Sequence, residues 1–329
     1  MTVIFGLKNS PAFFATLTNK ILGGYTGKFC SIYIDDIIFW SQTFEEHLNH
    51  LSQIFDRFKK ANLKLKPTKC HFAKPEVLYL GHIISKDGIK VDPSKTNAVK
   101  TFPMPRNQHD IRSFLGLCNY YRKFVKNYSK ITNPLNKLLV KDTKFKWTSK
   151  CQDAFEFLKE KLINAPILAS PDMNKPFILT CDASKSAVGY ILSQLGDDNK
   201  EHVISYNGRS LRPSEKNYGI TELECLSVID AVEHYYVYLT SQPFKIITDH
   251  QAIKYIQNFK HQNPRLMRWS LKLQNWDFTV EYKPGSKNTD ADCLSRRPYK
   301  PEQEEGEHNP RGLEDIPDPR EIIEITFDD

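Results

Sequence analysis

Apolar residues recur with two different periods along the first half of the chain, which predicts both helices and strands there. An apolar run at 13–22, preceded by Ser10-Pro11 and followed by two glycines, is typical of a short helix. Two β-rich runs, 28–34 and 37–40, flank Asp35-Asp36 and predict a hairpin with these two acids as its turn.

Helical spacing dominates the following stretch. A capping box at Thr43 and Glu46 predicts the start of one helix, and further strands are expected at 77–84, bounded by a turn at 86–88. Three more helical patterns lie near 93–101, 107–126 and 148–164.

From about Pro166 the pattern changes to short strands. Three successive strands are predicted at 177–181, 188–194 and 202–207, followed by a long helix at 218–238. The remaining predicted elements are a strand, two helical stretches, a strand and a short helix, at 244–248, 250–258, 264–275, 278–282 and 288–296. This order is typical of an α/β domain with a mixed sheet.

Length and charge divide the chain further. Its 329 residues predict about two domains, and 40% hydrophobic with 26% charged residues excludes global disorder. The net charge is +15 over 1–150, +1 over 151–300 and −9 over 301–329. The basic half favours a polyanionic partner, and the acidic, proline-containing end is expected to be disordered.

Two classes of site are not expected. The seven cysteines are widely spaced with no C-x-x-C pair, which fits a reducing compartment and predicts no structural zinc. No apolar run approaches the ~18 residues that span a bilayer, so no membrane partner is expected.

Four acids of the second half lie where carboxylates can converge. Asp182 and Asp249 end predicted strands, whereas Glu224 and Asp292 lie on predicted helices. A single Asp of this kind usually caps a helix or closes a turn. Four acids in this order favour a site for divalent cations, because cations offset their mutual repulsion. A pair of Mg²⁺ ions about 3.5 to 4 Å apart supports attack of water on phosphorus, so phosphodiester hydrolysis is the predicted chemistry.

The segments around these acids are FILTCDAS (177–184), TELECLSVIDAV (221–232), IITDH (246–250) and NTDADCLSR (288–296). Together they resemble the ribonuclease H domain of gypsy-class long-terminal-repeat retrotransposons. The resemblance implies an endonuclease that cuts the RNA strand of RNA:DNA hybrids. It also implies two Mg²⁺ ions, with Mn²⁺ as the alternative, held by Asp182, Glu224, Asp249 and Asp292.

The helix acid and the residue at 282 are the two positions where the resemblance leaves an alternative or departs from many relatives. Glu222 is an alternative to Glu224, which is preferred because Glu-Cys-Leu-Ser-Val resembles the family's Glu-Leu-Leu-Ala-Val. Tyr282 lies near the place where many relatives carry a His, and a Tyr does not titrate near neutral pH. A proton-shuttle role is therefore in question at this position.

The first half contains a second ordered set of segments: FGLKNSPAFF (5–14), SIYIDDIIFWS (31–41), LYLGHIIS (78–85) and SFLGLCNYYRKF (113–124). They resemble the palm, primer grip and thumb of a gypsy-class reverse transcriptase. The resemblance implies Asp35 and Asp36 as metal-binding catalytic acids. The residues expected at nucleic acid in the two halves are Phe5, Gly6, Tyr33, Leu80, Gly81, His82 and Tyr282.

The expected fold is α+β followed by α/β: a truncated palm and helical thumb, then a ribonuclease H-like mixed sheet. The expected domains are a partial palm at 1–90, a thumb and connection at 91–165, the ribonuclease H-like domain at 166–297 and an acidic tail at 298–329. The family's polymerase site uses a further Asp upstream of FGLKNSP, so this chain alone is expected not to polymerise DNA. A separate Pol-derived chain that supplies the fingers is one partner left open.

Two alternatives to an enzyme remain from the sequence. One is a non-catalytic or domesticated nucleic-acid-binding protein, in which a duplex backbone is followed by cations such as Arg112, Arg122, Lys123 and Lys126, with the later run from Lys137 to Lys150. The other is an unfolded product of a degenerate element, since a severed palm exposes sheet edges. The four acids favour the enzyme, with RNA:DNA hybrid, DNA and RNA as implied partners and an intracellular location.

Overall fold

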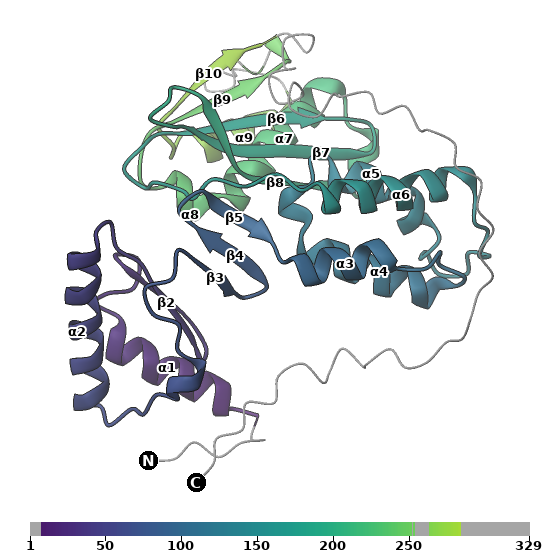
Figure 1. Ribbon diagram of the computed structural model, residues 1–329. Helices are drawn as coiled ribbons and strands as arrows, with labels where there is room; N and C mark the ends of the chain where they lie inside the picture. Colours follow the sequence, from purple (N-terminus) through teal and green to yellow (C-terminus); the bar gives the residue numbers. More distant parts are fainter. Residues whose placement is uncertain (1–7, 252, 254–262, 284–329) are drawn as a thin grey trace. The chain divides into compact units, whose positions relative to one another are not determined.

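The computed structural model describes residues 8–251, 253 and 263–283 (Figure 1). All of them belong to the first of two units, Met1–Gly285 and Ser286–Asp329. The predictions for Phe5, Gly6, Asp292, most of the helix at 250–258, the helix at 288–296 and the acidic tail lie outside the described residues.

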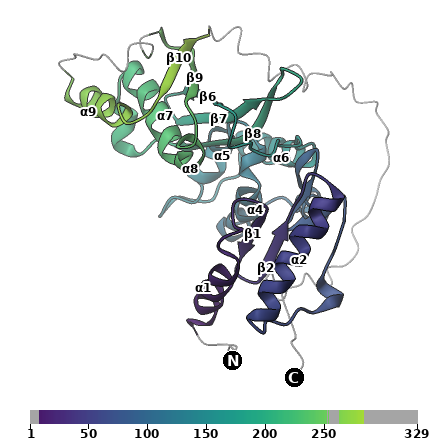
Figure 2. The same ribbon diagram turned by 90° about the vertical axis from the view of Figure 1, so that its left-hand side faces the viewer.

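The first part is a β-hairpin with two helices packed around it. Strand β1 (Cys30–Tyr33) pairs antiparallel with β2 (Asp36–Phe39), next to α1 (Ser10–Leu22) and α2 (Phe44–Lys60) (Figures 1 and 2). Leu22, Cys30, Ile54 and Phe58 form its small buried cluster.

The predicted hairpin is confirmed, but its turn comes one residue early. Tyr33 pairs with Asp36, so Ile34 and Asp35 form the turn, with Ile34 at a φ of 52°. A β-branched residue rarely adopts a left-handed φ, which is why the polar pair Asp35-Asp36 is the more natural turn to predict from sequence.

A small antiparallel sheet follows, in the order β3 (Glu76–Tyr79), β4 (His82–Ser85), β5 (Gly88–Val91). The strands predicted at 77–84 are confirmed as β3 and β4, and Leu80 and Gly81 form the tight turn between them, with φ of 47° and 65°. Left-handed φ at both central positions suits a two-residue hairpin, and glycine adopts it readily. The apolar Leu80 conceals this turn in the sequence.

Helices dominate residues 92–163. They are α3 (Pro93–Thr101), α4 (Gln108–Tyr120), the 3₁₀ turn η2 (Arg122–Phe124), α5 (Tyr128–Lys137) and α6 (Ser149–Ile163). The helix predicted at 107–126 therefore ends early, and the hydrophobic pattern does not predict α5. Pro134 lies inside α5, where proline ordinarily argues against a helix.

The second half is built on a five-stranded sheet in the order β10-β9-β6-β7-β8. Its strands are β6 (Phe177–Ala183), β7 (Ala187–Leu195), β8 (Glu201–Ser210), β9 (Phe244–Thr248) and β10 (Phe278–Tyr282). Strand β9 runs parallel to both β6 and β10, whereas β7 is antiparallel to both β6 and β8. The predicted mixed sheet is confirmed.

Three helices accompany this sheet: α7 (Ile220–His234), α8 (Tyr236–Leu239) and α9 (Pro264–Leu273). Helix α7 packs on β6 and β7 and also contacts α9, so most of its circumference is buried (Figures 1 and 2). The one long helix predicted at 218–238 is divided at Tyr235.

Two large apolar clusters meet at β8. The first lies between the sheet and α7, and the second is centred on α4, α5 and α6. Strand β8 contributes Ile204 to the first, while its Val203 and Tyr206 pack against the second. The helices of 92–163 and the five-stranded sheet are therefore joined by side-chain packing along this edge strand.

Candidate metal centre and nucleic-acid interface

Three carboxylates converge at one edge of the five-stranded sheet. Asp182 lies near the end of β6, Asp249 directly follows β9, and Glu224 lies on α7. One oxygen of each residue lies within 4.8 Å of the others. Among the described residues, no other group of three or more acids, histidines or cysteines is arranged to hold a metal ion.

The strand register explains this convergence. Strands β6 and β9 are parallel neighbours, and Thr180 is paired with Ile247. Asp182 and Asp249 each lie two positions further along, so their side chains point to the same face at the same level. Helix α7 packs on β6 and brings Glu224, which is only 7% exposed, to that point.

Burial and mutual repulsion disfavour ionisation of this cluster. Burial, with Asp249 and Asp182, raises the pKa of Glu224 to about 8. Burial and Asp249 also raise the pKa of Asp182, whereas Lys130 and Lys126 lower it. The Oε2 atom of Glu224 is buried without a hydrogen-bond partner in the described part of the chain. A nearby positive charge would relieve both the repulsion and the unsatisfied oxygen.

Glu222, the alternative helix acid, is occupied elsewhere. Its carboxylate accepts hydrogen bonds from Arg265 Nη1 at 2.6 Å, Gly219 N–H at 2.9 Å and Asn263 Nδ2 at 3.0 Å. Burial opposes these bonds, but together they lower the pKa of Glu222. The geometry thus places Glu224, and not Glu222, beside the two aspartates.

Tyr282 ends β10 at the same edge of the sheet. It is paired with Thr248, the residue before Asp249, and its side chain is 41% exposed. The fourth predicted acid, Asp292, lies outside the described residues.

The hairpin acids form a second, smaller acidic group. Asp35 and Asp36 are both exposed, and burial followed by Asp36 raises the pKa of Asp35. Tyr33 precedes the turn and is 56% exposed. Tyr79 of β3 donates its hydroxyl to the Asp36 carbonyl oxygen at 3.4 Å.

The predicted primer-grip residues form one turn that α4 holds. The Tyr120 hydroxyl donates to the Leu80 carbonyl oxygen at 2.6 Å, and the Tyr121 hydroxyl donates to that of Gly81 at 2.7 Å. His82 Nδ1 lies 2.8 Å from the Leu80 carbonyl oxygen, and burial and Lys123 lower the pKa of its imidazole. A neutral His82 can therefore donate to the turn that it follows.

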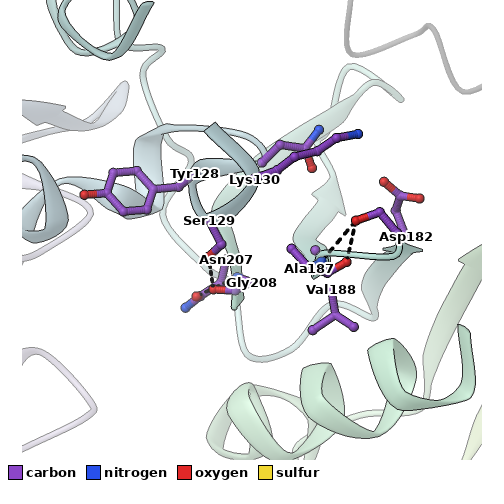
Figure 3. Close-up of a pocket in the computed structure, with 11 residues that line it drawn as sticks. Tyr128, Ser129, Lys130, Asp182, Ala187, Val188, Asn207 and Gly208 are labelled. Carbon is purple, nitrogen blue, oxygen red and sulfur yellow. Dashed lines mark hydrogen bonds between the residues drawn. The ribbon is translucent and has the colours of Figure 1, made fainter. Parts of the chain in front are cut away.

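A pocket beside Asp182 is lined by Lys130, a residue that the sequence pattern does not single out. It lies between the start of α5 and strands β7 and β8, and Lys130 and Asp182 both line it (Figure 3). Lys126 is one of the cations expected along a duplex, but Lys130 is not. No sequence signal identifies Lys130, because α5 itself is not evident in the pattern.

Two family models match the chain. Residues 2–84 match the reverse transcriptase (RNA-dependent DNA polymerase) model, and residues 172–276 match the RNase H-like domain found in reverse transcriptase. The Pol polyprotein of transposon 297 from Drosophila melanogaster is 42% identical over 294 residues, covering 89% of this chain and 27% of that protein. The chain is a homologue of retrotransposon Pol polyproteins. The resemblance stated from the sequence motifs is confirmed.

Further relatives agree with this assignment. The Pol polyprotein of transposon opus from Drosophila melanogaster is 38% identical over 306 residues, covering 89% of this chain and 30% of the relative. The Tf2-3 polyprotein of Schizosaccharomyces pombe is 37% identical over 296 residues, covering 89% of this chain and 22% of the relative. This Pol homologue spans about a quarter of the length of such relatives.

Solved structures confirm the fold class. A foamy viral protease-reverse transcriptase in complex with double-stranded DNA has a TM-score of 0.73 at 24% identity, covering 84% of this chain and 50% of that one. The same kind of protein in complex with an RNA/DNA hybrid has a TM-score of 0.71 at 23% identity, covering 93% of this chain and 42% of that one. Within the described residues, no helix of the Pol homologue is long and apolar enough to cross a membrane.

Proposed function

We propose that the second half of this chain is a ribonuclease H that hydrolyses the RNA strand of RNA:DNA hybrids. The observation that carries the proposal is the convergence of Asp182, Glu224 and Asp249 within the segment that matches the RNase H-like model. The domain boundaries 1–90, 91–165, 166–297 and 298–329 belong to the same proposal.

The three carboxylates fit a divalent cation. They supply hard oxygen ligands, and the buried Oε2 atom of Glu224 has no hydrogen-bond partner among the described residues. Mg²⁺ suits such ligands, with Mn²⁺ as the alternative, and we propose two ions with Asp292 as a fourth ligand. Bound ions of this kind lower the pKa of a water and stabilise charge on phosphate oxygens.

The protein itself holds and orients the three carboxylates. In the hydrolysis, a water oxygen bonds to phosphorus and the water gives up a proton, while the P–O3′ bond breaks and the leaving 3′ oxygen takes up a proton. The products are a 5′-phosphate and a 3′-hydroxyl. Asp182 lies near the end of β6 and Asp249 directly follows the adjacent strand β9, so the pairing of these strands fixes their spacing, and Glu224 is positioned by the buried helix α7. Rigid elements of this kind keep the ligands positioned before substrate arrives.

Charge supports a nucleic-acid substrate. Residues 1–150 carry a net charge of +15, which favours binding of a polyanion through released counterions. The foamy viral neighbours with double-stranded DNA and RNA/DNA hybrid agree with this class of partner. For the reverse transcriptase segment, we propose that Asp35 and Asp36 bind metal and that Tyr33 and the turn 80–82 lie near the primer strand.

A substrate panel tests the ribonuclease H proposal. The purified chain is incubated with Mg²⁺ and end-labelled RNA:DNA hybrid, double-stranded RNA or double-stranded DNA of one sequence. The expected result is cleavage of the RNA strand of the hybrid alone, abolished by EDTA. Intact hybrid in the presence of a folded chain that binds it would instead support the nucleic-acid-binding alternative.

A further inference from the structure

Helix α5 is held firmly against the sheet beside the acidic cluster. The Ser129 hydroxyl donates to the Gly208 carbonyl oxygen of β8 at 2.8 Å. Helix α5 also packs on β7 and β8, and a Cβ at Gly189 of β7 would lie 3.2 Å from the Asn127 Oδ1 atom at the start of α5, so a larger residue would crowd this contact. The start of α5 therefore has a defined position relative to Asp182.

This docking brings two lysines to the edge of the metal centre. Lys126 precedes α5 and is half-buried, while Lys130 lies in its first turn and is exposed. Figure 3 shows Lys130 extending from α5 on the side of the pocket where Asp182 lies. Both cations act on the Asp182 carboxyl, but within the described residues neither forms an ion pair.

Apart from Tyr128 and Val188, the remaining lining of the pocket consists of small or polar residues. Ser184 and Asn207 line it together with glycines at 189 and 208. The Ser184 hydroxyl is already engaged with the Ala187 backbone, accepting from its N–H at 3.1 Å and donating to its carbonyl at 2.9 Å. Lys130 is thus the cation at the mouth of this pocket whose ammonium group is available to an anion.

We propose that Lys130 binds a backbone phosphate of the RNA strand next to the scissile linkage, supported by Lys126 behind it. This inference rests on the ribonuclease H function proposed above. Lys130 would be a positioning residue, because it holds the strand in register over the acids without touching the reacting atoms. Since Lys130 belongs to a helix outside the matched RNase H-like segment at 172–276, the helical region completes the substrate surface of the site.

The test compares Lys130→Ala with Lys200→Ala in the full chain. Lys200 is exposed directly before β8, at the end of the β7–β8 pair opposite the pocket, and does not line the pocket. Hybrid affinity is measured with Ca²⁺ in place of Mg²⁺ over a range of salt concentrations. Lys130→Ala should weaken binding about 3- to 10-fold and reduce the slope of log K against log salt by about 1, whereas Lys200→Ala should change neither.

A second measurement locates the contact. Hybrids carry a single uncharged methylphosphonate at each of the linkages around the cleavage site. Neutralising the contacted phosphate should weaken the wild type but have no further effect on Lys130→Ala, and Lys130→Arg should retain the wild-type response. Additive losses at every linkage would overturn the proposal.

The outcomes distinguish the Lys130 contact from the proposed ribonuclease H activity. Wild-type cleavage together with an unaltered Lys130→Ala variant would refute the lysine contact and leave the ribonuclease H assignment intact. Absence of cleavage by the wild type would refute the ribonuclease H function, while the binding measurements with methylphosphonate hybrids would still decide whether Lys130 contacts a phosphate.

Discussion

At the scale of single residues, the account depends on which helix acid serves the metal centre. Glu222 and Glu224 are two residues apart on α7, but they face different partners. Glu222 is bonded to Arg265 and Asn263, whereas Glu224 is buried against Asp182 and Asp249. Sequence resemblance alone prefers Glu224, and the packing of α7 supplies the physical reason.

Glutamine substitutions at these two positions should have opposite effects. Glu224→Gln should lower RNA-strand cleavage by about 100-fold or more, since even residues that only support a ligand contribute about 10- to 100-fold. Glu222→Gln should leave cleavage near the wild-type rate and lower the free energy of unfolding by about 1 kcal/mol through its weakened bonds to Arg265 and Asn263. Equal loss of cleavage in both variants would contradict this division of roles.

The raised pKa of Glu224 predicts a pH-dependent stability in the metal-free protein. The folded-state pKa is about 8 against an ordinary value of 4.5, so the folded state favours the protonated carboxyl. The stabilisation that protonated Glu224 gives the folded state is fully present below pH 4.5 and is lost as pH rises through about 8. In EDTA, the free energy of unfolding should fall with a slope of up to about 1.4 kcal/mol per pH unit over this window.

Urea unfolding at several pH values measures this effect. Glu224→Gln cannot ionise at this position, so its stability should depend less on pH than that of the wild type over the same window. Added Mg²⁺ should raise the stability of the wild type most at the alkaline end. Identical pH profiles for the wild type and Glu224→Gln would show that the carboxyl is not perturbed as described.

At the scale of elements, the sequence predicts most strands and helices but misplaces the turns. The hairpin of β1 and β2, the five sheet strands and helix α7 all follow from periodicity. The failures share one cause: Ile34 and Leu80 are apolar residues with left-handed φ, and Pro134 lies inside a helix. In each case, tertiary contacts override the local conformational preference of the residue.

The same reasoning explains what could be predicted of the site. Asp182 and Asp249 are recognisable because they follow strands, and parallel pairing of those strands then brings them together. Lys130 is not recognisable, since its place depends on how α5 docks on β8, far away in sequence. That docking rests on the hydroxyl-to-carbonyl bond from Ser129 and on the small size of Gly189 beside Asn127, which leave no periodic pattern.

The turn between β3 and β4 provides a test at this scale. The largely buried Tyr121 hydroxyl donates to the Gly81 carbonyl oxygen at 2.7 Å, so Tyr121→Phe removes one bond and leaves the carbonyl without that donor. The free energy of unfolding should fall by about 1 kcal/mol, measured by urea unfolding. Tyr236→Phe is the matched control, because Tyr236 is exposed and its hydroxyl bonds to nothing among the described residues. A loss as large in the control would remove the special role of the turn.

At the scale of the whole molecule, the helices of residues 92–163 and the five-stranded sheet form one connected framework. The cluster centred on α4, α5 and α6 and the cluster under the sheet share β8, which couples the basic helices to the acidic centre. Relatives that match this chain combine the same two kinds of segment within much longer polyproteins.

The most direct test of the central claim is RNA-strand cleavage by aspartate variants of the metal centre. Asp182→Asn and Asp249→Asn keep the shape of each side chain and remove the charge, and Asp277→Asn is an exposed control before β10. The account predicts that both site variants still bind hybrid but cleave at least about 100-fold more slowly, while Asp277→Asn cleaves as the wild type does. Wild-type cleavage by Asp182→Asn and Asp249→Asn would contradict it.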